Sequence, residues 1–170
     1  MDETLQNPEL VAVQKKRLEL TRKKVEILQG FGLLRYRPFE KQHQFHAAGN
    51  KKRRFVRSGN RFGKSTLGCA EDCAWLLGER VWYPASSPLR TLGIPQRKGI
   101  KGLVITTDFD KVDEIWTGAG GKLWSMLPRD FVVKKTKNQQ GVIDTCVCAN
   151  GNILRFDTAK SFQNNPQGAE

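Results

Sequence analysis

The sequence Arg54-Phe55-Val56-Arg57-Ser58-Gly59-Asn60-Arg61-Phe62-Gly63-Lys64-Ser65-Thr66 decides the fold that we expect for this chain. It combines a short apolar run, a glycine-bearing turn and the opening of a helix. A phosphate chain needs backbone N–H donors at close range, a cation and a hydroxyl for a metal ion. The stretch supplies these groups in that order. It therefore predicts a phosphate-binding loop followed by a helix whose positive dipole end faces the phosphates.

The loop departs from the usual pattern G-x-x-x-x-G-K-[ST] at its entrance. Ser58 occupies the first glycine position, and Gly59 follows one place later. A serine at the entrance must adopt the backbone angles that glycine would have taken. The alternative interpretation is a glycine-rich turn in which Gly63-Lys64-Ser65 is incidental.

Length and composition indicate one soluble domain that binds a polyanion. The chain has 170 residues, 38% of them hydrophobic and 27% charged, with a net charge of +12. A field of that sign favours nucleic acid as a partner. No apolar run approaches the ~18 residues that span a bilayer. The N-terminus is acidic and lacks the apolar block of a secretory signal. We therefore expect no membrane association and a location in the cytoplasm of the cell or host.

The cysteines allow two interpretations. They are Cys69, Cys73, Cys146 and Cys148. A zinc site is conceivable, but the spacing does not match the common short-spaced knuckles. Reduced cysteines, buried as small hydrophobic residues or left free, fit a cytosolic chain better.

The N-terminal third of the chain predicts two helices ahead of the loop. Residues 8–29 contain helix formers, an apolar stripe and a cluster of basic residues, which predict a helix. This helix is either an arm that contacts DNA or a neighbouring subunit, or a packing helix with a solvated, charged face. A second, short helix begins after Pro38 and reaches His46. A glutamine side chain in this second helix could recognise adenine, because its amide can donate one hydrogen bond to the base and accept another from it. Gln42 is the first candidate, Gln44 is its competitor, and both residues could also be ordinary surface amides.

The rest of the chain predicts alternating strands and helices. Phe55-Val56 is expected to be a central strand, and residues 66–77 a helix that stops at Gly78. Residues 80–99 are expected to be a long loop. A continuous apolar run in residues 100–108 predicts a parallel strand buried on both faces. Residues 109–126 predict a helix interrupted at 118–121. An Asn-Gly turn predicts a hairpin formed by residues 141–148 and 152–158, followed by a loop-like tail.

With these features in place, the sequence from about residue 32 to the end resembles the ATPase domain of the large subunit of tailed-bacteriophage terminases, the motors that package viral DNA. The resemblance rests on residues 38–46, on the loop 58–65, on the strand 102–108 leading to a helix with Trp116, and on the hairpin and tail up to Gly168. It implies an α/β P-loop NTPase fold with a mainly parallel sheet flanked by helices. Residues 32–170 would form this domain, incomplete at its C-terminal side, and residues 1–31 a basic N-terminal arm.

The resemblance also implies roles for individual residues. Lys64 would hold the β- and γ-phosphates of ATP and Arg61 would stabilise the γ-phosphate, which makes both catalytic, while Ser65 would ligate Mg²⁺. The residues expected to contact the nucleotide are Gln42, Ser58, Gly59, Asn60, Arg61, Phe62, Gly63, Lys64, Ser65 and Thr66. The partners implied are double-stranded DNA, a small terminase subunit, a portal protein and neighbouring copies of the chain.

The family pattern is not fully met. Its second acidic motif, a strand ending in Asp-Glu, is not visible, although the strands that end at Asp108 and Asp157 could imitate it. The acidic cluster of the family's nuclease is absent too. We therefore expect an N-terminal fragment that binds nucleotide but hydrolyses it poorly, since a missing general base costs roughly 10²–10⁴ in rate. The alternatives are a helicase-like ATPase and a nucleotide-gated module that binds DNA or protein without turnover.

Overall fold

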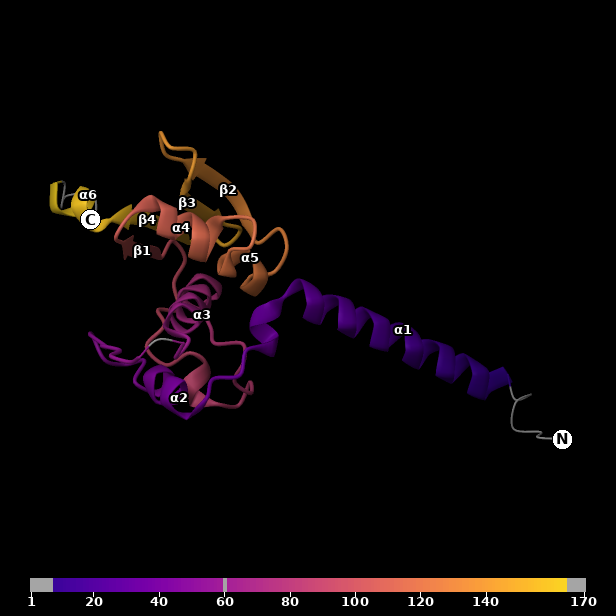
Figure 1. The fold of residues 1–170 in the computed structure, drawn as a ribbon. Coiled ribbons are helices and arrows are strands. Elements are labelled where there is room, and N and C mark those ends of the chain that lie inside the picture. The colour runs from indigo at the N-terminus through magenta and orange to yellow at the C-terminus, as the bar shows by residue number, and fades with distance from the viewer. Residues whose placement is uncertain (1–7, 60, 165–170) are drawn as a thin grey trace.

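The computed structural model describes residues 8–59 and 61–164, and Figure 1 shows how the elements are arranged. The helices are α1 (Pro8–Gly30), α2 (Glu40–Ala47), α3 (Lys64–Leu77), α4 (Phe109–Val112), α5 (Lys122–Met126) and α6 (Ala159–Asn164). Short 3₁₀-helices lie at η2 (Gly32–Arg35) and η3 (Pro88–Arg90), and η4 (Asp113–Thr117) is a π-helix. The strands are β1 (Lys101–Thr106), β2 (Val132–Lys137), β3 (Ile143–Cys148) and β4 (Ile153–Thr158).

The four strands form one mixed sheet in the order β1-β4-β3-β2, flanked by helices. The pair β1–β4 is parallel, whereas β3–β4 and β2–β3 are antiparallel. The predicted hairpin is confirmed: Gly151 takes a φ of 82°, and its N–H donates to Cys148 O over 2.9 Å. The expectation of a mainly parallel sheet was wrong, because such a tight turn can only join antiparallel strands.

The strand β1 is less covered than its sequence suggested. Its side chains alternate between exposed and half-buried, with Leu103 37% and Ile105 44% exposed. The apolar run of residues 103–105 therefore does not mark a strand buried on both faces. An alternating environment is what an edge strand of a mixed sheet has, and β1 is such an edge.

The segment that should have been the central strand is extended but unpaired. Residues 53–59 belong to no ladder in the structure, and Phe55 is 89% exposed. The prediction of a strand at Phe55-Val56 was therefore wrong. Its apolar run is too short to be buried on two faces, because Arg54 and Arg57 flank it directly.

The helix α3 supplies much of the core and confirms the helix predicted behind the loop. Leu67, Ala70, Cys73 and Ala74 are buried on one of its faces. The helix ends at Gly78, which has a φ of 91° and donates its N–H to Ala74 O over 2.8 Å. The buried cluster also includes residues from η4, α5, β3 and β4, namely Trp116, Leu123, Cys146, Leu154 and Phe156. Helix α3 therefore connects the end of the loop to the part of the molecule that contains the sheet.

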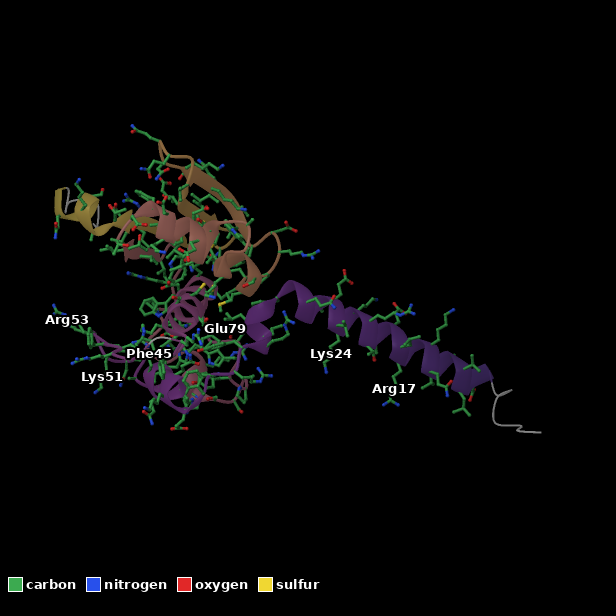
Figure 2. The ribbon with its side chains drawn as sticks, viewed as in Figure 1. Arg17, Lys24, Phe45, Lys51, Arg53 and Glu79 are labelled. Atoms are coloured by element: carbon green, nitrogen blue, oxygen red, sulfur yellow. The ribbon has the colours of Figure 1, made fainter. Side chains whose placement is uncertain are left out.

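The helix α1 projects from the body (Figure 1), and its side chains from residue 9 to residue 27 are all exposed. Figure 2 shows Arg17 and Lys24 extending from it into the open. Apolar residues share this exposure, for example Leu18 at 53% and Ile27 at 60%. None of the helices within residues 8–59 and 61–164 has the length and apolar character needed to cross a bilayer.

The C-terminal half differs from the sequence in two further ways. The helical region after β1 is divided into α4, η4 and α5, and the break at residues 118–121 is where the glycines predicted it. The strand β2 was not predicted, because five of its six side chains are exposed and do not alternate with buried ones, and the strand is defined by its pairing with β3. Part of the expected loop-like tail is helical, since α6 reaches Asn164, and residues 165–170 lie outside the described residues.

Candidate phosphate-binding site

The loop and the helix α3 meet in the arrangement that the sequence predicted. Gly63 precedes the helix with φ 78° and ψ 28°, a left-handed conformation that favours glycine. Its carbonyl accepts the first helical hydrogen bond, from the N–H of Leu67 over 2.8 Å. Lys64 is therefore the first residue of a 14-residue helix, and Ser65 and Thr66 lie in its first turn. Unpaired N–H groups and the positive dipole end are available there for an anion.

The ammonium group of Lys64 folds back across the loop. It donates to Ser58 O over 3.1 Å and to Gly59 O over 2.8 Å, and the side chain is exposed. Both hydrogen bonds are exposed to solvent, so a phosphate oxygen can replace these carbonyl oxygens. Arg61 is also exposed and has a φ of 63°, which is unusual for a residue with a side chain. Asn60 lies outside the described residues.

The structure separates the two candidates for reading adenine. Gln42 is 3% exposed. Its amide donates to Phe62 O over 3.3 Å and accepts from the hydroxyl of Tyr36 over 3.3 Å. The nitrogen of this amide thus contacts the loop at Phe62, and its oxygen is held by Tyr36. Gln44, two residues further on, is exposed and donates to Glu40 over 3.2 Å.

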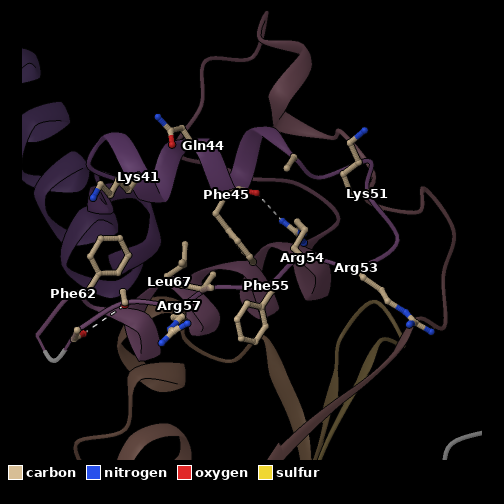
Figure 3. A pocket seen from close by; sticks show the side chains of 14 residues that line it. Lys41, Gln44, Phe45, Lys51, Arg53, Arg54, Phe55, Arg57, Phe62 and Leu67 are labelled. Atoms are coloured by element: carbon tan, nitrogen blue, oxygen red, sulfur yellow. Dashed lines mark hydrogen bonds between the residues drawn. The ribbon is translucent and has the colours of Figure 1, made fainter.

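A cavity of about 600 Å³ lies beside the loop (Figure 3), within the usual size range of ligand pockets. One wall comes from α2, with Lys41, Gln44 and Phe45, and the other from the extended segment 53–59. Phe62 and Leu67 close the side next to the loop. The described residues that line it include no carboxylate, and its charged groups are Lys41, Lys51, Arg53, Arg54 and Arg57. Its field therefore favours an anion.

Behind the loop, a buried carboxylate holds several cationic groups. Glu71, on α3, is 6% exposed and accepts from Arg80 Nε over 3.0 Å. Arg54 Nη2 lies 2.7 Å from Glu71 Oε1. His46 Nδ1 lies 2.8 Å from Glu71 Oε2, and its Nε2 lies 3.1 Å from the hydroxyl of Tyr36. We call Glu71, Arg80, Arg54, His46 and Tyr36 the Glu71 network.

The pKa values in the Glu71 network follow from burial and pairing. Burial alone would raise the pKa of the Glu71 carboxyl, but hydrogen bonds from His46 and Arg80 outweigh it and, with the nearby guanidinium charges, lower this pKa to about 2. Burial lowers the pKa of His46 despite its bond to Glu71. Burial also raises the pKa of Tyr36 above its usual range. At neutral pH the carboxylate is therefore ionised, while the imidazole and the phenol are neutral.

The Glu71 network was not predicted from the sequence, because its members lie far apart along the chain. His46 is fully buried against a carboxylate that comes 25 residues later. One signal was present: Glu71 lies between Ala70 and Cys73 on the apolar face of α3. A charge at a core position is kept only when it is paired, so that position predicts buried partners.

The acidic residues considered as substitutes for the missing motif do not join the loop. Asp108 caps α4 and accepts from the N–H of Lys111 over 2.8 Å, and Asp157 accepts from the N–H of Thr158 over 2.8 Å. The cavities that contain these carboxylates share no lining residue with the cavity beside the loop.

A protein-bound metal cluster is not formed in the described part of the chain. No group of three His, Cys, Asp or Glu side chains could hold a metal ion there. Cys69, Cys73, Cys146 and Cys148 are free and buried, as expected for reduced cysteines. Burial raises the pKa of Cys146 to about 12, so its thiol stays protonated.

Comparisons of the chain with protein-family models, with curated proteins and with solved structures found no match. The function is therefore inferred from the loop, the cavity beside it and the network behind it.

Proposed function

We propose that residues 58–66 bind the phosphate chain of ATP together with Mg²⁺. The observation that carries this proposal is the left-handed Gly63, which places Lys64 and Ser65 at the start of a 14-residue helix. Helix N-termini bind phosphate through free N–H groups and the helix dipole. The ammonium of Lys64 would move from the carbonyls of the loop to the β- and γ-phosphates, and Arg61 would stabilise the γ-phosphate.

The residues present fit a magnesium ion that is held mainly by the nucleotide. Mg²⁺ binds phosphate oxygens and waters and needs few protein ligands. The hydroxyl of Ser65, in the first helical turn and partly exposed, is the protein oxygen that we assign to it. When bound, the ion neutralises charge that develops on the phosphates.

The cavity beside the loop is where we place the base and the ribose. It borders Gly59 and Phe62, and it offers the aromatic faces of Phe45 and Phe62. Gln44 lines it, whereas the amide of Gln42 is engaged inside the protein. We therefore assign adenine recognition to Gln44 and the positioning of the loop to Gln42.

In biological terms we propose the ATP-binding part of a viral DNA-packaging motor, a terminase large subunit, acting in the cytoplasm of the host. Its partners would be double-stranded DNA, the small terminase subunit, a portal protein and further copies of the chain. The basic surface supports the DNA partner, since a net charge of +12 favours a polyanion.

A second candidate function is a nucleotide-gated binding module without turnover. It is favoured by one observation: no described carboxylate lines the cavity beside the loop, so no general base is in place for water. Steady hydrolysis of ATP by this chain alone would contradict this second function and support the motor.

The test of the proposed function is titration of the chain with a fluorescent ATP analogue in the presence of Mg²⁺. The variant Lys64→Ala is expected to abolish binding, while Lys98→Ala, which removes another exposed lysine, should leave it unchanged. Ser65→Ala should reduce the gain in affinity that Mg²⁺ provides. Equal binding by Lys64→Ala and the wild type would refute the phosphate loop.

The assignment of the base needs its own comparison. Gln44→Ala should reduce the preference for ATP over GTP while thermal stability is retained, because its side chain is exposed. Gln42→Ala should lower the affinity for both nucleotides, because the loop loses its hydrogen bond at Phe62 O. The reverse pattern would return the adenine-reading role to Gln42.

A further inference from the structure

The unpaired segment 53–59 presents an unusual outer face. In an extended chain successive side chains point to opposite sides, so Arg53, Phe55 and Arg57 share one side. All of them are exposed, and Phe55 is the extreme case at 89%. An aromatic ring left almost fully in water, on a chain that has a core to place it in, suggests a surface for a ligand.

The opposite side of the same segment is anchored. Arg54 pairs with Glu71 at 2.7 Å and donates to Phe45 O over 3.1 Å. Its guanidinium also stacks 4.3 Å from the centre of the Phe45 ring. Figure 3 shows Arg54 directed at Phe45, while Arg53 points away from it. The outer face is therefore held in place from behind, which lowers the entropic cost of binding a ligand there.

The chemistry of this face is an aromatic ring between two guanidinium groups. Arg53 and Arg57 each lie two residues from Phe55 along the chain, which places each at most about 7 Å from it along the backbone. Neither arginine has an ion-pair partner among the residues that the structure describes, and Lys51 and Lys52 add exposed cations just upstream. Figure 2 shows Lys51 and Arg53 on a turn that protrudes from the body. Cations at such intervals match a phosphodiester backbone, and the ring offers a base a stacking surface.

We propose that Arg53, Phe55 and Arg57 form a binding face for single-stranded nucleic acid. An unpaired base stacks on Phe55, and the flanking phosphates pair with Arg53 and Arg57. The bases of a duplex already stack on one another, so a duplex gains only the phosphate contacts. Arg53, Phe55 and Arg57 also line the cavity beside the loop, so this face adjoins the proposed nucleotide site. It uses neither Lys64 nor Ser65, the residues that hold the phosphates in the proposed binding of ATP.

The test measures the binding of labelled single strands by fluorescence anisotropy over a range of salt concentrations. The probes are oligo(dT), oligo(U) and a DNA duplex of equal length. Phe55→Ala should weaken single-strand binding about 5- to 150-fold, because stacking on an aromatic residue contributes about 1–3 kcal/mol per base. The salt dependence should stay unchanged, since no charge is removed. Phe55→Trp should retain the wild-type affinity.

Replacing the arginines should change the salt dependence of binding, in contrast to Phe55→Ala. Arg53→Ala and Arg57→Ala should each reduce the slope of log affinity against log salt by about 0.7, as the loss of one phosphate contact does for single strands. Val133→Ala, which truncates another exposed apolar residue, is the matched control for Phe55→Ala and should change nothing. Phe55→Ala should also unfold at the wild-type temperature, because it removes no core contact.

The outcomes separate this proposal from its rivals. Unchanged affinity in Phe55→Ala, or an equal loss for single strands and duplex, would overturn it. The proposal would also be overturned if the protein bound anionic vesicles or an acidic peptide as tightly as it binds the single strands. Binding of both oligo(dT) and oligo(U) supports recognition through the base and the phosphate, which DNA and RNA share. The probe with the higher affinity then shows whether DNA or RNA is preferred. Lys64→Ala should keep single-strand binding, so a failure of this proposal and a failure of nucleotide binding are distinguishable.

Discussion

Replacing Glu71 by glutamine should destabilise the protein strongly at neutral pH. Glu71→Gln keeps the size of the side chain but removes the charge that faces Arg80, which is 0% exposed, and Arg54. Leaving one partner of a buried ion pair without its counter-charge costs about 3–5 kcal/mol. Such a loss is a large part of the roughly 5–15 kcal/mol that stabilises a typical domain.

The pKa of Glu71 leads to a similar magnitude by an independent route. The difference between the ordinary pKa of 4.5 and the folded pKa of about 2 corresponds to about 3 kcal/mol of unfolding free energy at neutral pH. Because the folded pKa is the lower one, this stabilisation is present above pH 4.5 and is lost as the pH falls towards 2. His46, whose pKa is lowered by burial, adds a loss of the same sign as the pH falls below 6.5.

The assay is urea unfolding, followed by circular dichroism at neutral pH and at several acidic pH values. The control is Glu79→Gln, because Glu79 also pairs with an arginine, Arg90 at 2.6 Å, but its side chain is 39% exposed. Removing an exposed pair should cost about 1 kcal/mol or less. If Glu71→Gln costs no more than the control, or loses stability below pH 4.5 as steeply as the wild type, the central role of Glu71 is refuted.

Three further expectations concern the loop, an isolated carboxyl group and the projecting helix. Gly63→Ala should cost about 1–2 kcal/mol, because a side chain resists the left-handed conformation, and its Cβ would lie 3.0 Å from the amide nitrogen of Gln42. Gly59→Ala, whose Cβ would meet nothing within 4 Å, should cost little, and urea unfolding compares the pair. Burial, and then the charge of Glu71, raise the pKa of Asp72 from 3.8 to about 7. The contribution of this carboxyl to stability should therefore be lost as the pH rises from 3.8 to 7 in the wild type but not in Asp72→Asn. Deleting residues 1–27 should remove helical signal in circular dichroism yet leave the urea midpoint of the body unchanged, because the side chains of residues 9–27 are exposed.

The parts of the fold that were predicted from sequence are those whose signals are local. Helical periodicity and a glycine stop predicted α3, and an Asn-Gly turn predicted the pairing of β3 with β4. The strand β2 and the direction of most pairings could not be predicted, because they depend on which strands meet in space. The extended segment 53–59 failed for the same reason: two apolar residues suggest a strand, but only a neighbouring strand makes one.

In the candidate site, too, the features that depend on adjacent residues were predicted, and those that depend on distant contacts were not. The start of a helix directly after the loop follows from adjacent residues and was predicted, although α3 begins at Lys64, slightly earlier than expected. The role of Gln42 depends on contacts with Tyr36 and with Phe62, the latter 20 residues away, so its residue type alone could not distinguish a base reader from a loop support.

A continuous chain of contacts explains why the loop and the extended segment keep their geometry. It runs from Phe62 O to Gln42, on to Tyr36 and His46, and from there to Glu71, which holds Arg54. A buried polar network tolerates no missing member, since each unpaired group bears its full desolvation cost. The carbonyl of Phe62 and the backbone at Arg54 are therefore fixed by the same carboxylate. The proposed phosphate-binding loop and the proposed nucleic-acid face are thus connected through one buried network, although neither uses Glu71 to contact a ligand.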